Sequence, residues 1–323
     1  MRKHICLLLL LSLLLSGCGA GGEAEPVSTA AASAETAEPG SNALTFTDDL
    51  GREVTVEDPQ RVACLIGSFA DIWYLAGGAE RIVATANDTW TYFDLPLRED
   101  VVNLGATKEL DVEKLLSCEP DFVIASGNTA LNVELEPSFR EMGLNVAYFN
   151  VSTFDEYLHM LYVCTRITGC EENYQRYGTA IQERVKAAMA RADGREPSVL
   201  YIRASGSSCK VKNSQGSVLG EMLADLGCRN IADRENSLLE ELSLEAIIRE
   251  DPEYIFVILQ SSDPSVAQKT LDETLLSNPA WATLTAVEEG RYFVLDPTLY
   301  NLKPNERWAD AYEQLADILY GQA

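Results

Sequence analysis

Histidine is nearly absent from this chain: 323 residues contain only two. His4 belongs to an amino-terminal segment that we expect to be removed, and the helical setting of His159 indicates a structural role. Zinc and manganese sites draw on several His and carboxylate ligands, so we expect no direct metal site. Haem ligation would depend on Tyr, Met or His159, which does not favour haem.

Catalytic motifs are also missing. The chain has no Gly-x-Ser-x-Gly elbow, no His-Glu-x-x-His pair and no Walker-type phosphate loop. We therefore expect a protein that is not an enzyme and that takes any energy it needs from a separate ATPase. An exported hydrolase is the alternative class, and hydrolysis of an ester, glycoside or peptide would favour it.

Positive charge is scarce, with 25 Lys and Arg against 50 Asp and Glu. The formal net charge is −25, or −27 without Arg2 and Lys3. An acidic surface repels nucleic acid and anionic lipid, which excludes nucleic-acid binding.

Only one long apolar run is present, from Ile5 to Leu15, broken by Cys6 and Ser12. Its length of about 11 residues is too short to span a bilayer but suits an export signal. The run leads into Leu15-Ser16-Gly17-Cys18, which matches the bacterial lipobox. Residues 1–17 are therefore interpreted as a lipoprotein signal peptide, and Cys18 as the lipidated residue; an ordinary signal that happens to contain cysteine is the alternative.

Residues 19–41 are almost entirely Gly, Ala, Ser, Thr, Glu and Pro. Such a segment cannot bury enough apolar surface to offset its ordering entropy, so residues 18–42 are interpreted as a flexible tether. The mature chain keeps six further cysteines, whose spacing fits no zinc pattern. Cys64 is expected as a buried thiol in a core strand, and whether Cys209 and Cys228 form a disulfide is left open.

A unit of the sequence occurs twice. Residues 110–124 and 242–258 each contain a polar cap, a short amphipathic helix, a proline break and an apolar strand. Glu113 and Glu245 occupy the same place in each copy, seven residues before the proline. Continuous apolar strands flanked by helices indicate parallel sheets covered on both faces. We therefore predict two similar α/β lobes with mainly parallel sheets, over residues 43–168 and 195–323.

Between the lobes, apolar residues recur at helical spacing from Tyr174 to Met189. Residues 169–194 are predicted to hold one long helix that bridges the lobes, the alternative being a core helix of a single larger domain. A stiff connector predicts that the lobes move little relative to each other.

From Pro197 to Gly220 the chain has no acidic residue but contains three cations: Arg203, Lys210 and Lys212. This local positive charge favours an anionic group on a ligand; an ordinary solvated hairpin is the alternative. In such folds ligands lie against loops at the carboxyl ends of strands. The other candidate ligand-binding residues on those loops are Trp90, Tyr92, Ser126, Asn128, Ser205, Gln260, Tyr300 and Lys303. Trp90 and Tyr92 could equally serve in packing.

Several segments together resemble the substrate-binding lipoproteins of bacterial ABC importers for ferric siderophores, haem and cobalamin. The segments are 46–54 (FTDDLGREV), 59–62 (PQRV), 76–83 (AGGAERIV), the two Glu…Pro units and 301–308 (NLKPNERW). Their order and spacing cover residues 43–320. The resemblance implies two lobes joined by a long helix, a ligand cleft between them and no enzymatic activity.

By the same resemblance, Glu113 and Glu245 would each enter an arginine pocket of a permease dimer. The alternative is that each glutamate merely complements its helix dipole. The implied partners are the permease dimer and its ATPase, and the chain would act as a monomer anchored on the extracytoplasmic face of the cell membrane. The expected ligand is a large metal chelate, foremost a ferric siderophore, with haem or cobalamin as alternatives. A ligand-sensing lipoprotein without a permease is a further alternative.

Overall fold

The computed structural model describes residues 43–261 and 263–321. The expected signal, the lipidation site Cys18 and the tether all lie outside these residues. Among the helices of the described part, none combines the length and the apolar character that crossing a bilayer requires.

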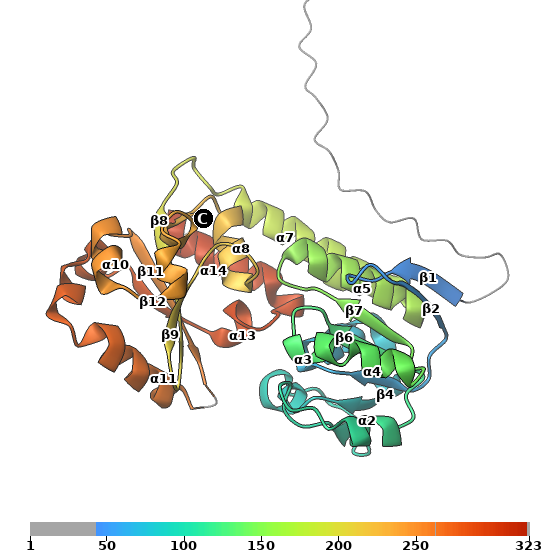
Figure 1. Cartoon of the computed structure of the whole chain (residues 1–323). Helices are drawn as coiled ribbons and strands as arrows, with labels where there is room; N and C mark the ends of the chain where they lie inside the picture. Colours follow the sequence, from blue (N-terminus) through green and yellow to red (C-terminus); the bar gives the residue numbers. More distant parts are fainter. Residues whose placement is uncertain (1–42, 262, 322–323) are drawn as a thin grey trace, which may run out of the picture. The chain divides into compact units, whose positions relative to one another are not determined.

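Two parallel sheets carry the fold (Figure 1). In the first, the spatial order is β5 (Val102–Asn103), β4 (Ile82–Thr85), β3 (Val62–Cys64), β6 (Phe122–Ser126) and β7 (Val146–Phe149). In the second it is β10 (Arg229–Asn230), β8 (Ser198–Ser205), β11 (Tyr254–Gln260) and β12 (Tyr292–Leu295), with β9 (Cys209–Lys212) antiparallel to β8. A hairpin of β1 (Ala43–Thr47) and β2 (Glu53–Glu57) precedes the first sheet.

Helices accompany both sheets. The amino-terminal lobe contains α1 (Gly67–Trp73), η1 (Tyr74–Gly78), η2 (Ala79–Arg81), η3 (Thr89–Phe93), α2 (Val112–Ser117), α3 (Ala130–Glu134), α4 (Glu136–Glu141) and α5 (Phe154–Thr168). The carboxyl-terminal lobe contains α8 (Val218–Asp225), η5 (Ile231–Asp233), α9 (Ser237–Glu240), α10 (Leu244–Glu250), α11 (Pro264–Leu271), η6 (Asp272–Leu276), η7 (Pro279–Thr283), α12 (Thr285–Glu288), α13 (Pro297–Tyr300), η8 (Asn305–Arg307) and α14 (Trp308–Tyr320). The predicted fold class, two α/β lobes with mainly parallel sheets joined by a helix, is confirmed.

The connecting helix is shorter than expected and is not α-helical throughout. It runs without a break through α6 (Glu171–Tyr174), the π-helical turn η4 (Gln175–Thr179) and α7 (Ala180–Met189). Gly178 of the π-helical turn is buried, and a Cβ there would lie 3.3 Å from Leu158 of α5. The turn therefore lies where the helix packs tightly on the amino-terminal lobe.

The connector does not stand alone, because α14 lies beside α7 (Figure 1). Arg184 of α7 forms ion pairs with Asp310 (2.8 Å) and Glu313 (2.7 Å) of α14. A single buried cluster includes Phe149 of β7, Val185 of α7, Tyr201 of β8 and Leu315 of α14. This core contains residues of both lobes, so it does not define where one lobe ends and the other begins. The lobe boundaries at residues 168 and 195 therefore stay a prediction.

The repeated sequence unit folds in the same way twice. Helix α2 leads into β6, beside β3, and helix α10 leads into β11, beside β8. The residue before each proline adopts a left-handed conformation, Glu119 at φ 45° and Asp251 at φ 40°. The acidic residue after each proline bonds to the start of the neighbouring strand: the amide of Asp121 donates to the carbonyl of Arg61 and that of Glu253 to the carbonyl of Ser198, both at 2.9 Å.

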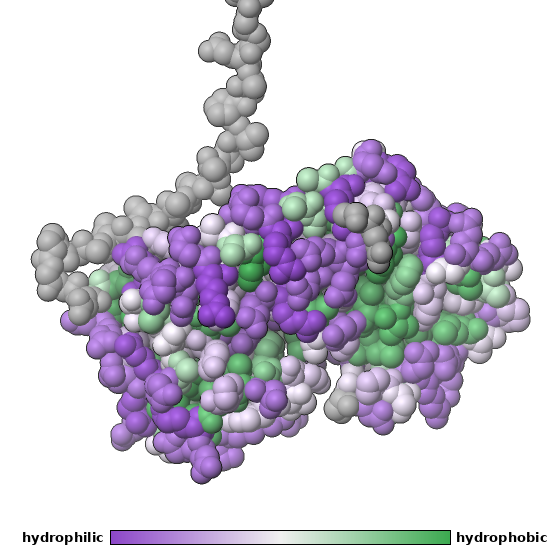
Figure 2. Space-filling view, turned by 180° about the vertical axis from the view of Figure 1, so that it is seen from behind, coloured by the Kyte–Doolittle hydropathy of each residue, from purple (hydrophilic) through white to green (hydrophobic). Residues whose placement is uncertain are grey.

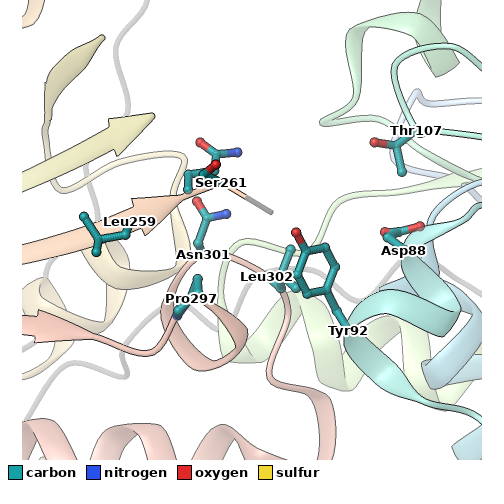
Figure 3. A pocket seen from close by; sticks show the side chains of 9 residues that line it. Asp88, Tyr92, Thr107, Leu259, Ser261, Pro297, Asn301 and Leu302 are labelled. Atoms are coloured by element: carbon teal, nitrogen blue, oxygen red, sulfur yellow. The ribbon is translucent and has the colours of Figure 1, made fainter. Parts of the chain in front are cut away.

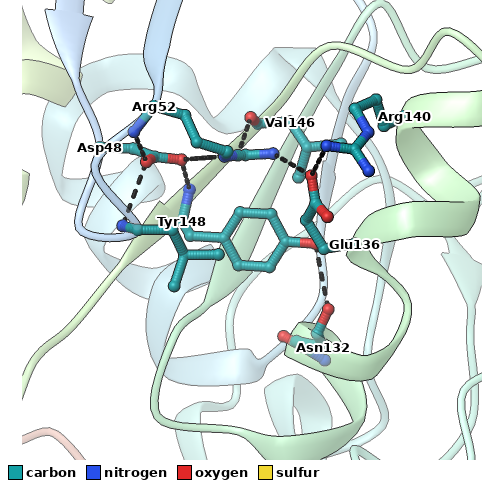
Figure 4. Close-up of polar contacts among 8 residues, drawn as sticks. Asp48, Arg52, Asn132, Glu136, Arg140, Val146 and Tyr148 are labelled. Carbon is teal, nitrogen blue, oxygen red and sulfur yellow. Dashed lines mark hydrogen bonds and ion pairs between the residues drawn. The ribbon is translucent and has the colours of Figure 1, made fainter.

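A turn covers the free edge of β7, the last strand of the first sheet (Figure 4). The carboxylate of Asp48, only 3% exposed, accepts hydrogen bonds from the amides of Arg52 (2.9 Å) and Tyr148 (3.1 Å). The Arg52 guanidinium donates to the carbonyl of Val146 (2.8 Å) and pairs with Asp48 (2.6 Å) and Glu136 (3.2 Å). Pairing the exposed backbone groups in this way protects an edge strand from joining another chain.

Candidate functional site: a cleft at the carboxyl ends of the strands

A cavity of about 220 Å³ lies where loops of the two lobes face each other (Figure 3). Each of its walls lies at or after the carboxyl end of a parallel strand, namely β4, β5, β11 or β12. This is where ligands bind in open α/β sheets. The lining residues are Asp88, Tyr92, Thr107, Leu259, Gln260, Ser261, Pro297, Asn301 and Leu302.

Asp88 fixes the loop that carries Tyr92. Its carboxylate accepts a hydrogen bond from the amide of Gly67 (2.9 Å), at the start of α1. A Cβ at position 67 would lie 2.5 Å from the amide nitrogen of Thr89, so the two loops approach closely only because residue 67 is glycine. Burial raises the pKa of Asp88, and the bond from Gly67 offsets part of that rise.

Tyr92 also lines a second cavity, of about 210 Å³. Its side chain, 41% exposed, projects toward Leu302 (Figure 3). The second cavity contains Lys303, whose pKa burial lowers to about 8 while nearby Glu156 partly opposes that shift. Asp71 also lines this cavity, and burial raises its pKa to about 6 against the hydrogen bond that it accepts from Asn305.

The three cations expected from the sequence lie on one face of the β8–β9 ribbon. Arg203 is directly opposite Lys210, and Lys212 is opposite Tyr201. Within residues 43–261 and 263–321, none of the three cations forms an ion pair with a carboxylate. Burial lowers the pKa of Lys212, and the charges of Arg203 and Lys210 lower it further.

Asn301 connects this basic cluster to the first cavity. Its side-chain oxygen accepts a hydrogen bond from Arg203 (3.4 Å), and the residue lines the cavity wall. The neighbouring Tyr201 hydroxyl is buried and has no hydrogen-bond partner among the described residues. The basic cluster therefore adjoins the cavity through Asn301, although the cations themselves are not among the lining residues.

The structure places the remaining candidates in different settings. Tyr92 and Gln260 line the first cavity, and Lys303 lines the second. Trp90 packs against the large shared core. Tyr300 is 1% exposed and donates its hydroxyl hydrogen bond to the carbonyl of Ala311 (3.0 Å), so it supports the fold instead of lining a cavity.

The small polar candidates bond within turns. The hydroxyl of Ser126 accepts from the amide of Asn128 (3.2 Å), whose side chain donates to Ser152 (3.1 Å). The hydroxyl of Ser205 accepts from the amide of Ser208 (3.1 Å) in the turn before β9. These three side chains have local partners, and none lines either cleft cavity.

Seven lining residues were not among the sequence candidates: Asp88, Thr107, Leu259, Ser261, Pro297, Asn301 and Leu302. Asp88 lies in the loop after β4, and Asn301 is the first residue of the 301–308 segment, after β12. The only sequence signal for these two residues was that each follows the end of a strand. Which side chain of each loop faces inward depends on turn geometry that the sequence pattern does not encode.

Glu113 and Glu245 lie on the surface, each at the second position of its helix, α2 and α10. Neither side chain forms an ion pair or side-chain hydrogen bond with another described residue. Both are accessible to a partner molecule.

The cysteines of the described part are all free. Cys209 packs in the cluster on one side of the second sheet, whereas Cys228 packs against the shared core on the other. The disulfide left open by the sequence is therefore not formed. Cys64 is fully buried in β3, as expected. Among the described residues, no group of three His, Cys, Asp or Glu side chains is arranged to hold a metal ion.

Seen from behind, most of the surface is hydrophilic (Figure 2). A hydrophobic area lies on the carboxyl-terminal lobe, and the surface is hollowed between the lobes at its lower edge.

The family model described as "Periplasmic binding protein" matches residues 62–299. The chain belongs to this family. Its members are solute-binding proteins, and the match takes in both repeated units and every cation of the basic cluster.

Among curated relatives, a "Cobalamin-binding protein" of Halobacterium salinarum is 24% identical over 279 residues, covering 83% of this chain and 74% of the relative. The "Fe(3+)-citrate-binding protein YfmC" of Bacillus subtilis is 22% identical over 255 residues, covering 77% of each. The apo form of the periplasmic haem-binding protein RhuT from Roseiflexus sp. RS-1 superposes with a TM-score of 0.66 at 20% identity, covering 81% of this chain and 98% of that one. At 20% identity, the similarity to this solved structure supports the fold and nothing further.

Proposed function

We propose that this family member is an extracytoplasmic lipoprotein, anchored through lipid on Cys18, which captures an anionic metal chelate for an ABC importer. A ferric siderophore is the foremost ligand. The basic cluster of Arg203, Lys210 and Lys212 carries this proposal. Three unneutralised cations on one face, in a chain of net charge −25, lower the energy of an anion at that place.

The shape of the site supports a binding role. A cleft between two lobes, lined by aromatic and small polar side chains, suits the enclosure of a chelate without chemical change. The relatives named for cobalamin and for Fe(3+)-citrate support a metal chelate as the class of ligand. Haem and cobalamin are therefore tested beside ferric siderophores.

Delivery requires a docking surface, and we assign that role to Glu113 and Glu245. Two exposed carboxylates at matching positions of repeated helices suit a permease with two-fold symmetry, since charge-assisted pairs with arginine fix the register of a complex. A ligand-sensing lipoprotein would need neither carboxylate.

The test of ligand class is a titration of tryptophan fluorescence with ferric citrate, a ferric catecholate, haem and cobalamin. Trp90 reports on the cleft because it lies two residues before Tyr92. We expect saturable binding of a ferric chelate, and Arg203→Ala should weaken it by ~1–3 kcal/mol through loss of a charge-assisted bond.

The matched control is Arg229→Ala, which changes an exposed arginine of β10 that pairs with Ser198 at the opposite, amino-terminal end of β8. It should bind as the wild type does. Unchanged affinity in Arg203→Ala would show that the basic cluster does not contact the ligand. Binding of cobalamin alone would contradict the proposal that the ligand is an anionic ferric chelate.

A further inference from the structure

The two copies of the repeated unit agree wherever the fold requires agreement. The caps Asp111 and Ser243 each accept a hydrogen bond from the amide three residues later, at 3.0 and 3.2 Å. At the fourth helical position, Leu115 (2% exposed) and Ile247 (0% exposed) both enter the core beneath the helix. Capping and burial account for these matches without reference to any partner.

The copies also agree at two exposed positions that the fold does not need. Glu113 and Glu245 hold the second helical position, and Leu116 and Ile248 hold the fifth. These aliphatic side chains are exposed to almost the same degree, 37% and 36%. Residues three apart on a helix are neighbours on one face, so each helix presents a carboxylate beside an exposed branched aliphatic group.

Neighbouring positions show that the agreement is selective. Lys114 is exposed while its counterpart Ala246 is buried, and Ser117 corresponds to Arg249, which pairs with Glu235. The surfaces of α2 and α10 have therefore diverged around a pair of groups that is the same in both. A large aliphatic side chain kept in water gains nothing for the fold, but it contributes to binding once a partner covers it.

We propose that Leu116 and Ile248 are apolar anchors of the docking surface, each seated by one half of a two-fold symmetric permease beside the arginine that takes the neighbouring glutamate. This inference rests on the proposed function and adds a partner feature to it: on each half, an apolar hollow about one helical turn from a basic group. The glutamates set charge and register, while the aliphatic groups supply the buried contact that slows dissociation.

The test measures the affinity of the purified, ligand-free protein for the permease–ATPase complex of the same cell, held in lipid nanodiscs, by biolayer interferometry. Leu116→Ser/Ile248→Ser should weaken this affinity about tenfold, as expected for two truncated anchors. Each single substitution should contribute about half of the effect on a logarithmic scale, because the two sites are equivalent. The double variant Leu116→Ile/Ile248→Leu, which keeps a branched aliphatic side chain at each position, should retain wild-type affinity.

Matched controls are Val133→Ser in α3 and Val294→Ser in β12, exposed aliphatic residues outside the repeated unit at 37% and 48%. They should dock normally, and all variants should keep wild-type melting temperatures. If Glu113→Ala/Glu245→Ala weakens docking while Leu116→Ser/Ile248→Ser does not, the anchors are refuted and the proposed function stands. If the wild type binds no permease, both fail together.

Discussion

Lys303 carries an ammonium group whose pKa lies close to physiological pH. Burial lowers the pKa of its ammonium group to about 8, with Glu156 partly opposing the shift, and Asp71 and Glu306 line the same cavity. The charged form therefore predominates below about pH 8 and is lost above it. An anionic ligand near Lys303 favours the charged form, so its binding above that pH is accompanied by uptake of a proton by the Lys303 amine.

The affinity for ferric citrate, as the simplest anionic chelate, should thus fall about tenfold between about pH 7 and about pH 9. Lys303→Met should bind more weakly at neutral pH and lose most of this dependence, as measured by fluorescence titration across that range. An equal pH dependence in Lys303→Met would place the ligand away from the second cavity.

At the scale of elements, the turn between β1 and β2 closes an edge of the first sheet. Asp48 accepts from the backbone amides of Leu50, Arg52 and Tyr148, and it pairs with the Arg52 guanidinium. Removing the carboxylate leaves these donors without an acceptor in a largely buried place, and such losses are costly.

Asp48→Ala should lower the free energy of unfolding by ~2–4 kcal/mol in urea denaturation. Asp100→Ala, which removes an exposed pair with Arg98, should change it by less than ~1 kcal/mol. A small effect of Asp48→Ala would show that water replaces the carboxylate and that the turn adds little stability.

The elements also show what sequence reasoning can reach. The repeated helix–proline–strand unit could be predicted because capping, apolar periodicity and proline act locally: the helices and strands expected within residues 110–124 and 242–258 appear as α2 and β6 and as α10 and β11. The π-helical turn in the connector lies where Gly178 packs tightly on Leu158 of another helix, a contact that the apolar spacing of the connector does not encode. For the same reason, the inward-facing Asn301 and the buried position of Tyr300 could not be predicted.

At the scale of the whole molecule, the lobes are joined by more than the connecting helix. Asn305 of the carboxyl-terminal lobe donates hydrogen bonds to the carbonyl of Ser68 (2.9 Å) and to Asp71 (2.6 Å) of the amino-terminal lobe. Together with the core that both lobes share, these bonds support the expectation that the lobes move little. A nearly rigid cleft would keep Glu113 and Glu245 at a fixed separation, as docking on a symmetric partner requires.

The most direct measurement is uptake of radioactive iron, supplied as a ferric siderophore that the purified protein binds, by cells that lack this gene. The wild-type gene should restore uptake. Glu113→Ala/Glu245→Ala should leave siderophore binding intact but restore less than about a tenth of the uptake, since docking depends on charge-assisted pairs. Full uptake without the gene, or full uptake with the double variant, would contradict the account.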